Sequence, residues 1–152
     1  MSANDWEEVA RNLLIEWTSP SAAGVSPLDR QGDEWWRTAF NEVGPINARL
    51  LEFSDGRAHA WQVSPLPQPP QPPLYRVQPR LAQPKWSWWN SRDWAQQHLS
   101  WIKTPGTCIM RASAISHVYA TITHQRQTPD GRTETGPTEV ICEVTEWERA
   151  DT

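Results

Sequence analysis

Aromatic and cationic side chains are interleaved between residues 75 and 101. Proteins hold single-stranded nucleic acids by stacking bases on aromatic rings and by neutralising phosphates with Lys or Arg. The same residue types anchor protein interfaces. If the backbone is extended through residues 85–89, Trp86 and Trp88 share one face. We expect the residues that bind a protein or RNA partner to be Tyr75, Arg76, Arg80, Lys85, Trp86, Trp88, Trp89 and Arg92.

Three interpretations of these aromatic residues are open: anchors of a protein interface, rings that close over the core, and direct contacts to nucleic acid. The chain of 152 residues has 11 Trp, more than a core of its size ordinarily buries, so we expect some indole rings to meet another molecule. Its isoelectric point of about 5.5 is low for an autonomous nucleic-acid-binding protein. The sequence therefore favours a protein interface.

The sequence has no recognisable catalytic or metal-binding pattern. Its four His residues do not occur at spacings typical of metal ligands, and it has no Gly-rich phosphate loop. Cys108 and Cys142 lie within apolar strand patterns, which are typical of buried thiols. We therefore expect a protein that is not an enzyme, with no catalytic residues, metal ligands or cofactors. An alternative is an enzyme with a dispersed site, which a titrating, partly buried His beside a Cys or a carboxylate would favour.

Charge is unevenly distributed along the chain, whose net charge is −4. Residues 1–55 have four basic and ten acidic side chains, residues 56–129 have eight and one, and residues 130–152 have two and seven. The basic middle could face an anionic partner, or the acidic ends could fold over it and neutralise it. A second hypothesis makes the chain an acidic inhibitor, such as an immunity protein or a phage anti-defence protein, that blocks an enzyme. It would bind a cationic site on that enzyme through its acidic ends, and charge reversal at Glu139, Glu143 and Glu146 should cripple such an inhibitor.

The spacing of apolar residues predicts two main helices, at 5–17 and 91–102. Together with the strands, they indicate an α+β fold in which antiparallel β-hairpins pack against the two main helices. The length fits a single domain over residues 1–152. A shorter helix is expected at 34–43, strands at 47–53, 58–63, 109–114, 116–124 and 138–147, and tight turns at 54–57 and 129–132.

Prolines are concentrated between Pro65 and Pro84. Such a stretch cannot form a helix or a central strand, and it favours extended polyproline geometry. We interpret residues 64–89 as a proline- and tryptophan-rich extended arm within the domain. It would be a surface arm or a semi-rigid spacer that reaches a neighbouring subunit. The segment 67–70 also resembles ligands of SH3 domains.

The predicted hairpin consists of an extended segment at 47–53, a tight turn at 54–57 and a returning segment at 58–63 that contains Trp61. This hairpin resembles a segment of the small accessory proteins of type III-D CRISPR systems. Those proteins pair an Arg-x-x-x-Phe strand with an acidic-Gly turn and a following Trp. The residues that carry this resemblance here are Arg49, Phe53, Asp55, Gly56 and Trp61. The resemblance covers about a quarter of the chain. It implies a non-catalytic subunit docked on a crRNA-guided effector complex, with a role in antiviral defence.

From these patterns we expect a non-catalytic assembly or recognition subunit of an intracellular nucleoprotein complex, such as a type III CRISPR effector. Its partners would be protein subunits of that complex, with indirect or direct RNA contact and no small-molecule cofactor. No apolar run is long enough to span a membrane, and residues 1–15 lack a secretion signal. We therefore expect a cytoplasmic location and no membrane partner.

Overall fold

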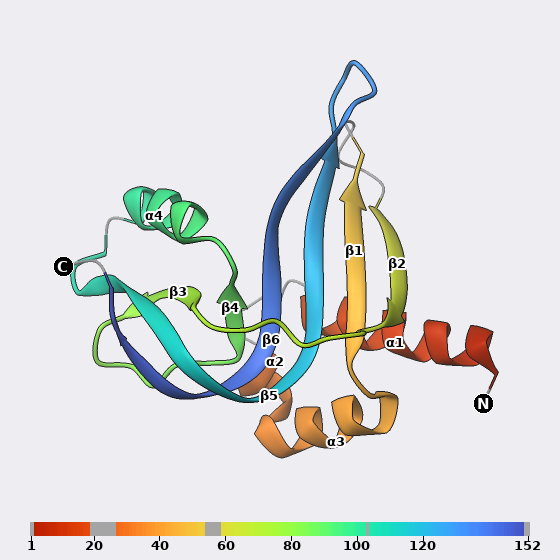
Figure 1. Ribbon diagram of the computed structural model, residues 1–152, viewed down its shortest axis with the longest axis horizontal. Helices are drawn as coiled ribbons and strands as arrows, with labels where there is room; N and C mark the ends of the chain where they lie inside the picture. The colour runs from red at the N-terminus through yellow and green to blue at the C-terminus, as the bar shows by residue number, and fades with distance from the viewer. Residues whose placement is uncertain (1, 19–26, 54–58, 103, 151–152) are drawn as a thin grey trace.

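The computed structural model describes residues 2–18, 27–53, 59–102 and 104–150 (Figure 1). The described part of the chain has an α+β fold, as the sequence predicts. Its helices are α1 (Ala3–Thr18), α2 (Pro27–Gln31), α3 (Asp33–Val43) and α4 (Arg92–Trp101). Its strands are β1 (Ile46–Glu52), β2 (His59–Pro65), β3 (Leu74–Pro79), β4 (Ser87–Trp89), β5 (Thr107–Gln127) and β6 (Thr133–Arg149).

Side-chain caps fix where the two main helices begin. At α1, the Asp5 amide donates to the Ser2 hydroxyl, and the Asp5 carboxylate accepts from the Ser2 amide at 3.2 Å. This reciprocal pattern satisfies amides that the first helical turn leaves unpaired. At α4, the hydroxyl of Ser91 accepts from the amide of Trp94 at 3.1 Å. Both helices lie within one or two residues of the predicted ranges, whereas α2 has no counterpart among the predicted elements.

The six strands form one sheet in the order β2-β1-β5-β3-β4-β6, and β5 also pairs with β6. β1 runs parallel to β5, and the other pairs are antiparallel. The first half of β5 pairs with β3 and its second half with β1, which is possible because β5 has 21 residues. Strands β5, β3, β4 and β6 therefore close into a ring.

The last two strands differ from the prediction. Residues 109–114 and 116–124 were expected to form separate strands, but they belong to the single strand β5. Register shifts against β6 occur between Ala112 and Val118, so the strand bends without ending. The predicted turn at 129–132 is present, with Gly131 at φ 87°. The other predicted turn, at 54–57, lies outside the described residues.

Two apolar clusters make up the core. One lies between the sheet and helices α1, α2 and α3, and the other lies inside the ring of strands. Four Trp side chains are buried, namely Trp17, Trp36, Trp86 and Trp88, whereas Trp35, Trp101 and Trp147 are exposed. The expectation that some indoles lie at the surface is confirmed. The expectation that Trp86 and Trp88 share a face is wrong, because Trp86 packs under the helices and Trp88 packs inside the ring.

The proline-rich segment is bounded by strands of the same sheet. In Figure 1 the connection from β2 to β3 runs across the sheet. Pro69, Pro70 and Pro72 line a cavity together with residues 115–118 of β5. The later part of residues 64–89 contains β3 and β4, which are strands within the ring.

Candidate functional site

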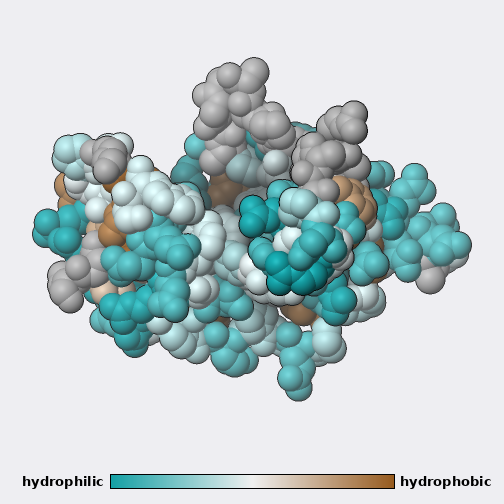
Figure 2. Space-filling model, turned by 90° about the horizontal axis from the view of Figure 1, so that it is seen from above, coloured by the Kyte–Doolittle hydropathy of each residue, from teal (hydrophilic) through white to brown (hydrophobic). Residues whose placement is uncertain are grey.

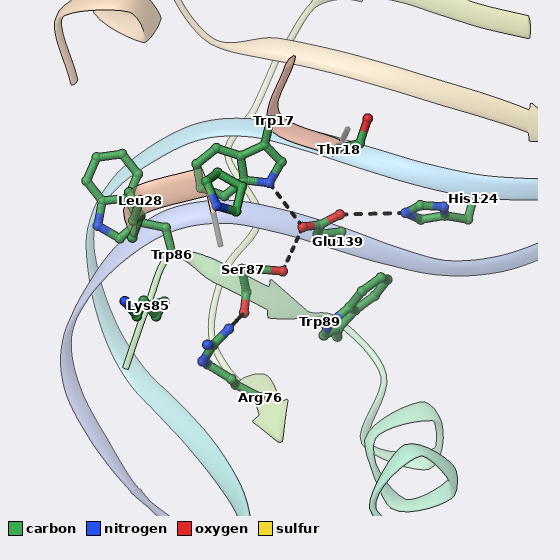
Figure 3. Close-up of a pocket in the computed structure, with 11 residues that line it drawn as sticks. Trp17, Thr18, Leu28, Arg76, Lys85, Trp86, Ser87, Trp89, His124 and Glu139 are labelled. Carbon is green, nitrogen blue, oxygen red and sulfur yellow. Dashed lines mark hydrogen bonds and ion pairs between the residues drawn. The ribbon is translucent and has the colours of Figure 1, made fainter. Parts of the chain in front are cut away.

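A cavity of about 360 Å³ opens between the end of α1, the start of α2 and strands β3 to β6 (Figure 3). It combines apolar walls with a small number of polar groups. Period-two alternation in β4 positions two of its side chains, since Ser87 and Trp89 face the cavity while Trp88 points into the ring. The lining residues are Trp17, Thr18, Pro27, Leu28, Arg76, Lys85, Trp86, Ser87, Trp89, His124 and Glu139.

Packed aromatic rings form one wall of the cavity. The rings of Trp17 and Trp86 stack with centroids 6.3 Å apart, and Trp86 also stacks on Tyr119 at 5.0 Å. The guanidinium of Arg37 lies 5.5 Å from the Trp86 ring centroid, a cation–π arrangement. Because neighbours hold these rings from several sides, the wall is formed before any ligand arrives.

Glu139 is a buried carboxylate in this cavity, with 8% of its surface exposed. Its Oε2 accepts from the Ser87 hydroxyl at 2.6 Å and from the Trp17 indole N–H at 3.4 Å. Its Oε1 lies 3.7 Å from Nε2 of His124. Within the described residues, Glu139 has no Lys or Arg at ion-pair distance. Neutral donors therefore supply its hydrogen bonds.

Arg76 places a cation beside the same cavity. Its Nε donates to the Gln78 side chain at 3.0 Å and its Nη1 donates to the Ser87 carbonyl at 2.8 Å. Burial lowers the pKa of the Arg76 guanidinium, and the negative charge of Glu139 acts in the opposite direction. No carboxylate of the described ranges lies within ion-pair distance of Arg76.

His124 completes the polar side of the cavity. It lies where the β5–β6 register shifts, between Thr123 and Gln125. Its Nε2 atom is buried and has no hydrogen-bond partner among the residues that the structure describes. His124 and Glu139 thus place a partly buried imidazole beside a carboxylate, which is one part of the arrangement expected of a dispersed-site enzyme, and that alternative stays a prediction.

From the cavity, a row of aromatic rings leads out along α4. The Trp89 ring lies 5.5 Å from that of His124 and stacks on Trp94 at 4.1 Å. Trp94 in turn stacks on His98 at 4.8 Å, and Trp101 follows at 6.4 Å. Trp101 is 70% exposed. We call Trp89, Trp94, His98 and Trp101 the α4 aromatic row.

No known relative identifies this chain. No family model, curated protein or solved structure matches it. The resemblance to accessory proteins of type III-D CRISPR systems therefore stays a prediction. No helix among the described residues is long and apolar enough to cross a membrane. Within those residues, no group of three or more His, Cys, Asp or Glu side chains could hold a metal ion.

The structure brings four of the eight predicted binding residues to the cavity: Arg76, Lys85, Trp86 and Trp89. Lys85 lies at ion-pair distance from Asp29, with its Nζ 2.7 Å from Oδ1. Among the other four, Tyr75 is partly buried in β3, Arg80 is exposed, and Arg92 is exposed and donates to the Ala150 carbonyl.

The prediction that Trp88 binds a protein or RNA partner is wrong. The Trp88 indole is fully buried inside the closed set of strands, and its N–H donates to the Lys85 carbonyl at 2.9 Å. It cannot present a face to a partner while the protein is folded. For this residue the core-closure interpretation is the correct one.

The prediction that Glu139, Glu143 and Glu146 offer an acidic binding surface is also wrong at two positions, Glu139 and Glu143. Glu139 and Glu143 alternate with Val140 and Cys142 as predicted, but α1 and α3 cover their face of β6. Glu143 forms an ion pair with Arg37 at 2.7 Å. Of the three, only Glu146 is exposed.

Both cysteines are buried, as the sequence predicts. Burial raises the pKa of the Cys142 thiol to about 12. The nucleophilic thiolate is therefore a very small fraction of Cys142 near neutral pH.

Proposed function

We propose that this chain is a binding protein for a small, flat organic molecule that enters the cavity between α1, α2 and strands β3 to β6. The partly buried Arg76 is the observation that carries the proposal. A buried cation is costly unless a counter-charge or hydrogen bonds compensate it. The described residues use only part of the five N–H donors of this guanidinium. An acceptor or anionic group on a ligand would satisfy the remaining donors.

The walls of the cavity suit a flat apolar body. Small-molecule sites are usually clefts of a few hundred Å³ or more, with apolar and aromatic walls and few polar groups that fix orientation. This cavity has about 360 Å³ and three indole rings, from Trp17, Trp86 and Trp89. Leu28 of α2 adds an aliphatic contact on the same side.

The anionic aromatic dye anilinonaphthalene sulfonate tests this proposal. Its ring system suits the indole wall, and its sulfonate suits Arg76. We expect saturable dye fluorescence with the wild type, and at least about tenfold weaker binding for Arg76→Gln, because a charge-assisted hydrogen bond is lost. Leu28→Trp should weaken binding similarly by filling the cavity. Fluorescence titration gives the dissociation constants.

Matched controls place the same substitutions outside the cavity. Arg80→Gln changes an exposed Arg just beyond the end of β3, and Leu81→Trp changes a side chain that is 95% exposed. Both should bind the dye as the wild type does, and circular dichroism should show that all four variants are folded. Equal dye binding by all variants would place the dye on the general surface and overturn the proposal.

Partner binding is a second candidate function, and the exposed end of the α4 aromatic row favours it. Hydrophilic residues cover most of the face shown in Figure 2, with hydrophobic residues in small separate areas. Trp101 is nevertheless 70% exposed. Exposed Trp side chains are enriched at protein interfaces and are frequent binding hot spots.

Under this second candidate, Trp101→Ala should release protein or RNA partners that co-purify with the wild type, as quantified by mass spectrometry and bound-RNA analysis. The matched control is Trp147→Ala, another exposed Trp. Partners retained by Trp101→Ala at the wild-type level would remove this candidate. The substitution avoids the core, which a change at Trp88 would disrupt.

A further inference from the structure

We propose that the cavity selects a zwitterionic ligand: an α-amino acid, or a molecule of similar charge spacing, with a flat aromatic side chain. This inference rests on the proposed ligand-binding function. The ammonium group would face Glu139, the carboxylate would face Arg76, and the ring would lie against the indole wall.

Glu139 supplies the anionic half of this recognition. Its Oε2 already accepts from Ser87 and Trp17, whereas Oε1 accepts no hydrogen bond from a described residue and lies 3.7 Å from Nε2 of His124. A carboxylate has about four lone-pair sites, so Oε1 has capacity for a further donor. A ligand ammonium would add the cation that this buried carboxylate lacks among the described residues.

Arg76 supplies the cationic half. Its guanidinium has unused N–H donors, and the planar group suits a carboxylate. Lys85 does not change this balance, because it is already paired with Asp29 at the edge of the cavity. The cavity therefore offers one charge of each sign, and neither forms a Lys/Arg–carboxylate ion pair within the described residues.

Ser87 sets the spacing between the two charges. Its carbonyl accepts from Arg76 while its hydroxyl donates to Glu139 (Figure 3). The guanidinium and the carboxylate thus lie on either side of a single residue. A matching ligand needs its own opposite charges close together, as the ammonium and carboxylate of an α-amino acid are.

Four 3-substituted indoles that carry different charged groups test the inference by isothermal titration calorimetry at neutral pH. L-tryptophan has both charges, tryptamine is a cation, indolepropionate is an anion, and skatole is neutral. We expect L-tryptophan to bind at least about tenfold more tightly than each of the others, because it alone satisfies both protein charges. If tryptamine, indolepropionate or skatole binds as tightly, the inference is overturned.

Two variants assign each charge to its residue. Glu139→Gln should remove the preference for L-tryptophan over indolepropionate, and Arg76→Gln should remove its preference over tryptamine. Each preference is a ratio measured within one variant, so a general loosening of the cavity does not imitate the result. Arg80→Gln should retain both preferences. Unchanged preferences in the Glu139 and Arg76 variants would contradict the assignment.

The dye titration separates this inference from the function on which it depends. If the wild type binds the dye in the cavity but none of the four indoles, ligand binding stands and zwitterion selection is overturned. If neither the dye nor any indole binds in the cavity, both proposals fail.

Discussion

Replacing Trp88 with alanine is expected to lower the free energy of unfolding by about 3 to 5 kcal/mol, the usual cost of truncating a buried Trp. The Trp88 indole is fully buried inside the closed set of strands, where it packs with Leu74, Val140 and Cys142. Truncation leaves a cavity that rigid strands can fill only in part. It also leaves the Lys85 carbonyl without its indole donor.

Urea unfolding followed by circular dichroism measures this loss, and Trp101→Ala is the matched control. Trp101 is 70% exposed, so its truncation should change the free energy of unfolding by no more than about 0.5 kcal/mol. Equal and small effects at the two positions would contradict the burial of Trp88. They would restore the interpretation of Trp88 as a surface anchor.

Replacing Glu143 with glutamine is expected to lower the free energy of unfolding at pH 7 by about 2 kcal/mol, since hydrogen bonds to charged groups are the stronger ones. The Glu143 carboxylate accepts from Arg37 Nε at 3.0 Å and from Arg37 Nη2 at 2.7 Å, and it also accepts from the Tyr119 hydroxyl. These contacts join α3 to β5 and β6, behind the aromatic wall of the cavity.

The pH dependence of this effect follows from the pKa of Glu143. Hydrogen bonding from Arg37 holds that pKa below its ordinary value of 4.5, and the hydrogen bond from Tyr119 acts in the same direction. A lowered folded-state pKa gives stability that is present above pH 4.5 and is lost as pH falls through the folded pKa.

Urea unfolding of the wild type and Glu143→Gln at several pH values should show this behaviour. The difference in unfolding free energy should be largest near neutral pH and should shrink towards pH 3. Glu146→Gln, in the exposed part of the same strand, should have little effect at either pH. A Glu143→Gln difference that stays constant down to pH 3 would show that charge plays no part in the contact.

Local patterns predicted the elements well because each depends on neighbours in the sequence. The apolar face of α1 repeats at helical spacing, and Ser91 caps α4 where the sequence places it. The alternation of Val140 and Cys142 with Glu139 and Glu143 along β6 was also predictable. In contrast, the sequence did not show that helices cover the second face of β6, because that depends on packing between distant segments.

Only the residues of the candidate site that lie close together in the sequence could be predicted. Arg76, Lys85, Trp86 and Trp89 lie close together in sequence, and their residue types indicate binding. Trp17, His124 and Glu139 come from α1, β5 and β6, and no spacing links them. Glu139 and Trp17 are separated by 122 positions, yet they share a hydrogen bond. The register shift at His124 is a separate local irregularity of the β5–β6 pair, which apolar alternation does not predict.

Closure of β5, β3, β4 and β6 into a ring limits how copies of this protein can associate through their backbones. Among the described strands, β2 stands at the end of the sheet order and pairs with β1 alone. Gln62, Ser64 and Pro65 of that strand are exposed, and Pro65 has no N–H to offer an incoming strand. The edge of β2 is therefore a poor template for intermolecular sheet growth, which is the first step towards aggregation.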